Sequence, residues 1–191
     1  MEIQRLKKAT ETYGLDLSQK SLRAFSALCK ETTYLAGGII FKPNRNNKSE
    51  YVLLKGIART FLLNTQGEEI TLSFFEENMI LPPCVTRTKN EKSLLYGEAL
   101  TDCVFAEINA DDFESLMIEN LEIRDFGNSV LRQELLNKVH KEIRMATWTA
   151  KRRLDQFRDD FGMLENRIPH PMIASYLGIT NVSLSRLRKR S

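Results

Sequence analysis

The last 23 residues of the chain constrain its fold most strongly, because their apolar side chains are spaced as in two short helices joined by a tight turn. Ile173 and Leu177 lie four residues apart, and Leu184 and Leu187 lie three apart, so each pair shares one face of a helix. Gly178 stands between the pairs, where the backbone must turn through a conformation that is costly for a residue with a Cβ atom. The spacing predicts a helix-turn-helix.

The boundaries of both helices are also readable. Pro169 and Pro171 are placed to open the first helix, and the small Ala174 suits the point where the two helices approach most closely. Thr180 precedes the second helix, where its hydroxyl can accept a hydrogen bond from a backbone N–H near Val182 or Ser183. A corner between two helices therefore fits better than one continuous helix.

Positive charge is concentrated at the same end. No acidic residue follows Glu165, and the body of the chain carries a net charge of about −2 against +5 for the tail. The basic residues of the tail are Arg167, Arg186, Arg188, Lys189 and Arg190. Such residues can simply solvate a helix end and complement the helix dipole. Joined to the helix-turn-helix spacing, however, they favour binding to double-stranded DNA.

Composition places the chain among globular proteins. The 191 residues are 42% hydrophobic and 28% charged, which allows one substantial domain and a small second one. There is no signal sequence and no run of 18 apolar residues, so we expect a cytoplasmic protein without a membrane partner. Cys29, Cys84 and Cys103 are widely spaced and odd in number, which disfavours a disulfide framework or a zinc site.

The N-terminal part of the chain changes texture after about residue 31. Residues 2–31 have helical patterns interrupted near Gly14, whereas residues 34–108 hold short strand-like runs separated by turn signals. The residues around Leu53 and Phe61 do not alternate cleanly with polar ones, which suggests that Gly56 marks a bulge, a bend or a strand boundary. An antiparallel β domain is predicted here.

A longer helix is predicted from about Leu121, following a short helix that Asn109 or Asp111 could cap. Apolar side chains recur on it every four residues, at Leu131, Leu135, Val139 and Ile143. This stripe needs a partner, either the β domain of its own chain or the same helix of a second subunit. Thr147 or Thr149 could cap the next helix, so the long helix should end near there.

This order of elements, together with PHPMIASYLGITNVSLSRLRKR and EALTDCVFAEI, resembles the family of the cyclic-AMP receptor protein and the fumarate and nitrate reduction regulator. The resemblance covers essentially the whole chain. It implies an α+β protein with a cyclic-nucleotide-binding-like antiparallel β-roll and flanking helices in residues 1–118. A long dimerisation helix and hinge would follow in 119–148, and a winged-helix-like helix-turn-helix domain in 149–191.

The resemblance also implies roles for individual residues. Asn181, Val182 and Arg186 stand where the family reads base edges, and Arg186 could bond to the O6 and N7 of guanine, or alternatively contact a phosphate. Val182 departs from the glutamate of many relatives and offers only apolar contact. Phosphate contacts would come from Thr180, Ser183, Ser185, Arg188, Lys189 and Arg190. The dimer seam would comprise Leu131, Leu135, Val139 and Ile143. A homodimer that contacts RNA polymerase is implied, although repression by occlusion is equally compatible.

The residues of the β-roll that would bind cyclic AMP depart from the family pattern. Pro82 and Pro83 occupy the Gly-Glu positions that bind cyclic AMP, and Ser93 and Leu94 occupy the Arg-Ser positions. An anionic ligand would lose its charge partner and backbone donors, so we expect no useful cyclic-AMP binding. Arg87 and Lys89 could compensate, but solvated loop charges are the simpler interpretation of both.

Other cofactors and an enzymatic activity are disfavoured. Three scattered cysteines do not suit an iron–sulfur cluster, and His140 and His170 lie outside the β region, which argues against haem and cupin-type metal sites. The acidic pairs Glu76–Glu77 and Asp111–Asp112 are expected at a turn and a helix start rather than in an enzyme active site. We predict a non-enzymatic regulator without a cofactor. Its β-roll either binds an unidentified small-molecule effector or serves only as a scaffold. The alternative is a small-molecule receptor with a degenerate or secondary DNA-binding end.

Overall fold

The computed structural model describes residues 3–189. At position 163 it describes the backbone but not the side chain. The chain divides into two compact units. The first, here called the roll unit, comprises the residues up to 60 together with 74–135. The second, here called the C-terminal unit, comprises 61–73 together with the residues from 136 onward. Each unit is described by itself below.

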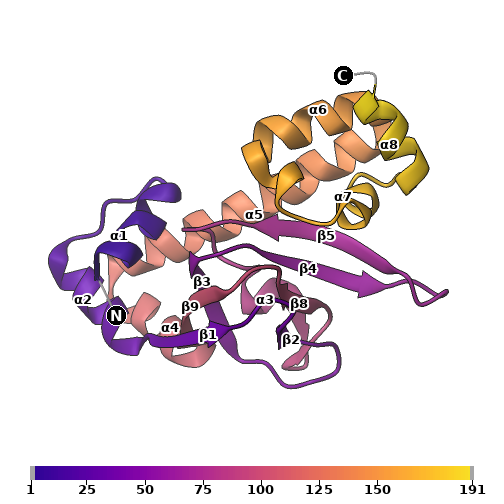
Figure 1. The fold of residues 1–191 in the computed structure, drawn as a ribbon. Coiled ribbons are helices and arrows are strands. Elements are labelled where there is room, and N and C mark those ends of the chain that lie inside the picture. The colour runs from indigo at the N-terminus through magenta and orange to yellow at the C-terminus, as the bar shows by residue number, and fades with distance from the viewer. Residues whose placement is uncertain (1–2, 190–191) are drawn as a thin grey trace. The chain divides into compact units, whose positions relative to one another are not determined.

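The roll unit has helices before and after its strands and one short helix between them (Figure 1). The helices that begin in this unit are α1 (Ile3–Thr12), α2 (Gln19–Leu28), the short α3 (Cys84–Arg87), α4 (Ala110–Glu119) and α5 (Leu121–Thr147). Gly14, at φ 78°, lies between α1 and α2, as the interrupted helical pattern predicts. The long helix predicted from Leu121 is confirmed, and it ends at Thr147.

Two antiparallel sheets and a small ribbon make up the β structure. The first sheet has the order β1-β9-β3, the second β2-β8-β4-β5, and the ribbon consists of β6 and β7. The strands are β1 (Lys30–Tyr34), β2 (Ile39–Phe41), β3 (Ser49–Lys55), β4 (Ala58–Leu63), β5 (Glu69–Phe75), β6 (Thr88–Lys89), β7 (Lys92–Ser93), β8 (Tyr96–Ala99) and β9 (Cys103–Asn109). The predicted antiparallel β-roll with flanking helices is therefore confirmed.

Strand β3 explains why the sequence does not alternate cleanly between apolar and polar residues. Tyr51 and Leu53 belong to a core cluster inside the roll, with Phe105 of β9, whereas Val52 and Leu54 belong to a second cluster with α1, α2, α4 and α5. A strand buried on both faces has no polar face to alternate with. The register of β3 on β9 shifts between Leu53 and Lys55, next to Gly56 at φ 100°.

Side-chain caps fix the helix starts that the sequence predicts. The carboxamide oxygen of Asn109 accepts hydrogen bonds from the backbone N–H groups of Asp111 and Asp112, at the start of α4. Thr149 accepts from the N–H of Arg152 and so caps the helix after α5. Asp111 and Asp112 thus occupy the first turn of a helix, as expected.

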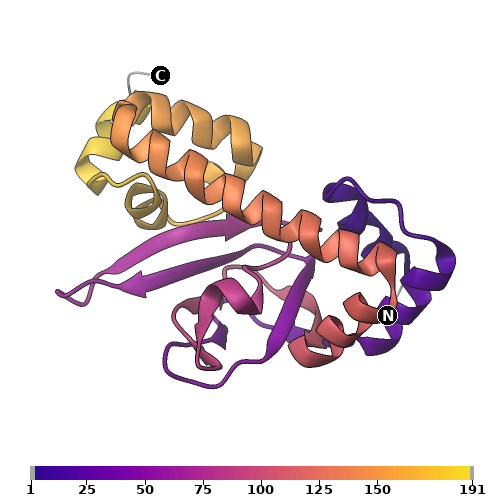
Figure 2. The same cartoon turned by 180° about the vertical axis from the view of Figure 1, so that it is seen from behind.

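The C-terminal unit is predominantly helical in its described residues (Figure 2). After the end of α5 come α6 (Ala150–Phe161), the 3-10 helix η1 (Gly162–Asn166), α7 (His170–Tyr176) and α8 (Asn181–Lys189). Arg144 of α5 pairs with Asp160 of α6 at 2.6 Å. No strand follows β9 within residues 3–189, so the strands of a wing have no counterpart in that part of the chain.

Candidate nucleic-acid interface

Helices α7 and α8 form the predicted helix-turn-helix and close on a common apolar core. Ile173, Leu177 and Leu184 are buried, as is the small Ala174, whereas Leu187 is partly exposed. They share the core of the C-terminal unit with Leu154, Phe157, Leu164 and Ile168. The spacing of apolar residues thus predicted the faces of both helices correctly, because short amphipathic helices must bury those faces together.

The turn between the helices has the predicted geometry. Gly178 has φ 64°, in the left-handed region that favours glycine. Pro169 stands at the N-cap of α7, with Pro171 in its first turn. The hydroxyl of Thr180 accepts a hydrogen bond from the N–H of Ser183 at 3.2 Å and therefore caps α8. Thr180 also donates to Ser183 Oγ at 3.0 Å, so both hydroxyls predicted to contact phosphates serve the cap in this structure.

The polar face of α8 remains open to solvent in this chain. Asn181, Val182, Ser185, Arg186 and Lys189 are exposed, and the exposed fraction of Val182 is 59%. Leu184, by contrast, is 1% exposed on the opposite side of the helix. The structure thus brings the three expected base-reading residues to one accessible helix. Arg190, an expected phosphate contact, lies outside the described residues.

Arg188 is placed differently from the other basic residues of α8. Its Nε lies 2.7 Å from a carboxylate oxygen of Glu165, and its Nη1 lies 3.1 Å from Nδ1 of His170. Glu165 also accepts hydrogen bonds from Nε and Nη2 of Arg158, at 2.7 and 3.2 Å. The hydrogen bonds from Arg158, and then the charges of both arginines, hold the pKa of Glu165 below its usual value. Arg188 therefore helps to hold α8 in place, a role that counting basic residues did not reveal.

Strand β5 contacts helices α5 and α7 within the C-terminal unit. The backbone N–H of Thr71 donates to Ser175 Oγ of α7 at 3.1 Å. Lys141 of α5 donates to the carbonyl of Leu72 at 2.6 Å, and its Nζ lies 4.0 Å from the centroid of the Tyr176 ring. Sequence reasoning missed these contacts because they join segments about 70 and 100 residues apart, for which no periodic signal exists.

The roll interior contradicts the expectation that Arg87 is a solvated loop charge. Arg87 lies on α3 and is fully buried. Its Nε donates to the carbonyl of Pro82 at 2.9 Å, its Nη2 donates to the carbonyl of Ser49, and its guanidinium lies 4.8 and 5.2 Å from the ring centroids of Phe41 and Tyr51. Aromatic faces and backbone carbonyls compensate a buried guanidinium, which explains this placement. Lys89, by contrast, is exposed on β6.

The positions expected to lack cyclic-AMP contacts are also placed by the structure. Ser93 is buried, and its hydroxyl donates to the carbonyl of Leu95 at 2.8 Å. Leu94 is 50% exposed, and Pro83 is the N-cap residue of α3. The N–H of Cys84, the next residue, donates to the carboxylate of Glu50. The Ser93 hydroxyl and the Cys84 N–H therefore both bond to groups of the chain itself.

Three further features concern metal ligands, membrane-spanning helices and cysteines in the described residues. Within residues 3–189, no group of three or more His, Cys, Asp or Glu side chains is arranged to hold a metal ion. In the same part of the chain, no helix is both long enough and apolar enough to span a membrane. Cys29, Cys84 and Cys103 are free thiols.

The comparisons with known proteins agree with this architecture. Residues 31–120 match the cyclic nucleotide-binding domain family. The global nitrogen regulator of Nostoc sp. is 25% identical over 168 residues, which cover 81% of this chain and 75% of that protein. Among solved structures, FixK2 from Bradyrhizobium japonicum has a TM-score of 0.72 at 17% identity and covers 85% of this chain and 83% of its own. The c-di-GMP responsive global regulator CLP of Xanthomonas campestris has a TM-score of 0.72 at 16% identity and covers 91% of both chains.

The match over residues 31–120 and the β-roll define a chain with a cyclic nucleotide-binding domain. Over most of its length, the chain is similar to transcription regulators of the family that includes the cyclic-AMP receptor protein and the fumarate and nitrate reduction regulator. Its homologues are transcription regulators, a non-enzymatic family.

Proposed function

We propose that this chain is a homodimeric, sequence-specific DNA-binding regulator of transcription that reads the major groove with α8. The observation that carries the proposal is the division of α8 into two faces. Asn181, Val182 and Arg186 are exposed, while Leu184 anchors the helix in the core. A helix held in this way can present its first turns to base edges, and the exposed Ser185 and Lys189 can reach phosphates.

Arg186 is the residue assigned to guanine. Its guanidinium can bond bidentately to O6 and N7, a contact worth about 1–3 kcal/mol of discrimination against a wrong base. Val182 is assigned apolar contact with a thymine methyl group, so the preferred half-site should differ from that of relatives with glutamate there. Arg188 is assigned to positioning α8 through Glu165, and any phosphate contact would compete with that ion pair.

Selection of binding sites from a random duplex library tests this proposal. Wild-type protein should enrich a two-fold symmetric motif, and Arg186→Ala should lose the guanine preference at one position of each half-site. Arg167→Ala is the matched control, because Arg167 is exposed at the end of η1, outside α8. It should weaken binding without changing the motif. The absence of any enriched motif at low salt would contradict the proposal for the ligand-free protein.

The same proposal assigns the dimer seam to one stripe of α5. Leu135, Val139 and Ile143 are 65, 42 and 50% exposed in the single chain, and Leu131 extends the stripe. Exposed leucine, valine and isoleucine at intervals of four residues are typical of a helix that pairs with a second helix. To read successive major grooves, a dimer paired in this way must hold its two copies of α8 about 34 Å apart.

The seam is tested by the double variant Leu135→Asp, Val139→Asp. We expect a monomeric mass and a loss of DNA affinity, since a carboxylate in an apolar seam is costly to bury. His140→Asp is the matched control, because His140 is exposed on the same helix and lies one residue beyond the stripe. Unchanged mass and DNA affinity in the double variant would show that α5 is not the seam.

The proposed function includes loss of cyclic-AMP binding. This part is supported by the two prolines at the Gly-Glu positions, by the exposed Leu94 and by the burial of Arg87 among Phe41, Tyr51 and backbone carbonyls. A calorimetric titration with cyclic AMP should give no saturable binding, and micromolar affinity would contradict it. The proposal further includes activation of transcription through contact with RNA polymerase and a location in the cytoplasm. It also includes the division of the chain into three segments, residues 1–118, 119–148 and 149–191.

A further inference from the structure

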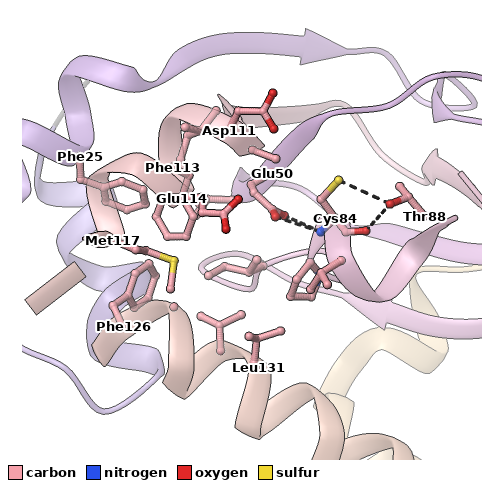
Figure 3. A pocket seen from close by; sticks show the side chains of 18 residues that line it. Phe25, Glu50, Cys84, Thr88, Asp111, Phe113, Glu114, Met117, Phe126 and Leu131 are labelled. Carbon is pink, nitrogen blue, oxygen red and sulfur yellow. Dashed lines mark hydrogen bonds between the residues drawn. The ribbon is translucent and has the colours of Figure 1, made fainter. Parts of the chain in front are cut away.

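The roll unit contains a cavity of about 410 Å³ that lies outside the roll interior (Figure 3). Its walls come from α2, β3, α3, β9, α4 and the N-terminal half of α5. Cavities of this size are typical of small-molecule sites, which generally combine an apolar body with a few polar groups. Both components are present here, at different parts of the wall.

Aromatic side chains form the apolar part of the cavity. Phe25 of α2 lies 5.6 Å from Phe113 of α4 and 5.6 Å from Phe126 of α5, measured between ring centroids. Met117 of α4 covers Gly127 of α5 so closely that a Cβ atom at position 127 would lie 2.6 Å from Met117 Cε. Glycine at this position therefore leaves room for the methionine side chain beside the cavity.

Carboxyl groups form the polar part. Glu50 of β3 accepts hydrogen bonds from the N–H of Cys84 at 3.0 and 2.9 Å, as Figure 3 shows, and the exposed Glu114 of α4 lines the same cavity. Asp111 also lines the cavity but pairs with Lys48 at 3.4 Å. Among the lining residues in the described part of the chain, none is Lys, Arg or His. Burial raises the pKa of Glu50 to about 7, against the opposing effects of the Cys84 N–H and Arg87.

Pro83 is the one residue that the cavity shares with the described positions corresponding to the cyclic-AMP site of the family. Phe41, Tyr51, Arg87, Ser93 and Leu94 do not line it. Pro83, Cys84, Val85 and Thr88 of the α3 segment do, so the cavity and the roll interior use different faces of that segment. A ligand in the cavity would thus contact α3, α4 and α5 simultaneously.

We propose that this cavity binds a hydrophobic amine, with its nitrogen between Glu50 and Glu114 and its apolar body among Phe25, Phe113 and Phe126. An ammonium or N–H group would supply a donor to the buried carboxyl group of Glu50, and a positive charge there would also be attracted to the exposed Glu114 at the cavity wall. Anionic ligands such as nucleotides or fatty acids would meet only like charge there. The assignment concerns ligand binding alone and does not depend on recognition of DNA.

The site is tested first with the fluorescent probe N-phenyl-1-naphthylamine, which joins two aromatic groups through one N–H donor. Purified full-length protein at pH 7.5 should bind it saturably, with one probe per chain. Met117→Trp, which fills the cavity, should weaken binding by about tenfold or more. Ile118→Trp is the matched control, because Ile118 is the next residue of α4, is 78% exposed and does not line the cavity; this variant should bind as the wild type does.

The head group is tested by displacing the probe with decylamine or decanoate, which share a similar alkyl chain but carry opposite charges. Decylamine should displace the probe at a concentration about tenfold or more below that of decanoate. Glu50→Gln keeps the acceptor for the Cys84 N–H but removes the charge. This variant should reduce the ratio of the decanoate concentration to the decylamine concentration needed for displacement, and Glu114→Gln should reduce the same ratio.

Three results would overturn the inference. The absence of saturable probe binding would show that the cavity takes no such ligand, and equal effects of Met117→Trp and Ile118→Trp would place the probe elsewhere. Equal or stronger displacement by decanoate would contradict the amine assignment. All three results are obtained without DNA, so they are distinguishable from failure of the proposed regulator function.

Discussion

The two units of this protein use basic side chains in opposite ways. In the C-terminal unit, Arg186 and Lys189 are exposed on α8, and one buried carboxylate, Glu165, holds Arg158 and Arg188. In the roll unit, Arg87 is enclosed by aromatic rings and backbone carbonyls, and the carboxyl group of Glu50 lines the cavity. The comparison teaches that burial, rather than the number of arginines, decides which unit can attract an anionic partner.

The largest expected effects come from removing core side chains in each unit separately. Leu184→Ala should destabilise the C-terminal unit by about 2–5 kcal/mol, and Phe105→Ala should destabilise the roll unit by about 3–5 kcal/mol. Trp148, the single tryptophan, lies in the C-terminal unit, so its fluorescence should follow the first variant. Circular dichroism should report both. If each variant shifts both signals equally during thermal unfolding, the units do not unfold separately and the comparison fails.

The sequence predicted the C-terminal unit in greater detail than the roll unit. Ile173, Leu177 and Leu184 are a few residues apart, so local periodicity alone identifies their common core. Arg87, in contrast, is buried by Phe41 and Tyr51, which lie 46 and 36 residues earlier in the sequence. Strand register determines that contact, and the sequence of one strand does not determine the register of its neighbours when both of its faces are buried.

The candidate sites follow the same division. Exposure of Asn181, Val182 and Arg186 could be predicted because these residues lie on the polar side of a short amphipathic helix. The pairing of Glu165 with Arg158 and Arg188 could not be predicted, because residues of three separate helices meet there. The cavity likewise depends on how β3, α3, α4 and α5 pack, and no local pattern reports packing.

The second prediction concerns Glu165, whose ion pairs hold α8 to the rest of its unit. Glu165→Gln should destabilise the C-terminal unit by about 1–3 kcal/mol, because two hydrogen-bonded arginines lose a buried carboxylate. Asp155→Asn is the control, since the exposed pairs of Asp155 should contribute less than about 1 kcal/mol. Both variants are compared by the Trp148 unfolding transition. Equal effects would show that Glu165 acts as an ordinary surface charge.

The pH dependence of this effect has a definite sign. The pKa of Glu165 is lower in the folded chain than its ordinary value, so its stabilisation is present above about pH 4.5 and is lost as the pH falls through the folded value. The difference between wild type and Glu165→Gln should therefore shrink on acidification. A difference that stays constant from pH 7 to pH 3 would contradict the assigned pairing.

The third prediction uses Lys141, which bonds to the carbonyl of Leu72 beside the ring of Tyr176. Burial, and secondarily the charge of Lys138, lowers the pKa of Lys141 to about 7. Because the unfolded chain binds this proton more tightly, stability of the C-terminal unit should rise between about pH 7 and pH 10. Lys141→Met should flatten this rise in the Trp148 transition, whereas Lys151→Met, at an exposed site, should not.

The fourth prediction concerns the roll unit, where the pH dependence has the opposite sign. The pKa of Glu50 is raised to about 7, mainly by burial, so the folded chain binds this proton more tightly than the unfolded chain does. Stability of the roll unit should therefore be greatest below about pH 4.5 and decline as the pH rises to 7, by at most about 1.4 kcal/mol per pH unit. Glu50→Gln should remove this decline in unfolding followed by circular dichroism. Glu98→Gln is the control, because Glu98 pairs with the buried Arg59 at 2.6 Å and should leave the decline in place.

Opposite pH slopes would follow from the two environments rather than from the numbers of acidic and basic residues. Lys141 is a buried cation and Glu50 a buried carboxyl group, and burial disfavours the charged form of each. Raising the pH neutralises Lys141 but charges Glu50. The roll unit should therefore lose stability between about pH 4.5 and 7, and the C-terminal unit should gain stability between about pH 7 and 10. A hydrophobic amine bound beside Glu50 should reverse only the second slope, because its positive charge would stabilise the ionised carboxylate. Unfolding curves with and without decylamine would thus separate the contribution of the cavity from that of the C-terminal unit.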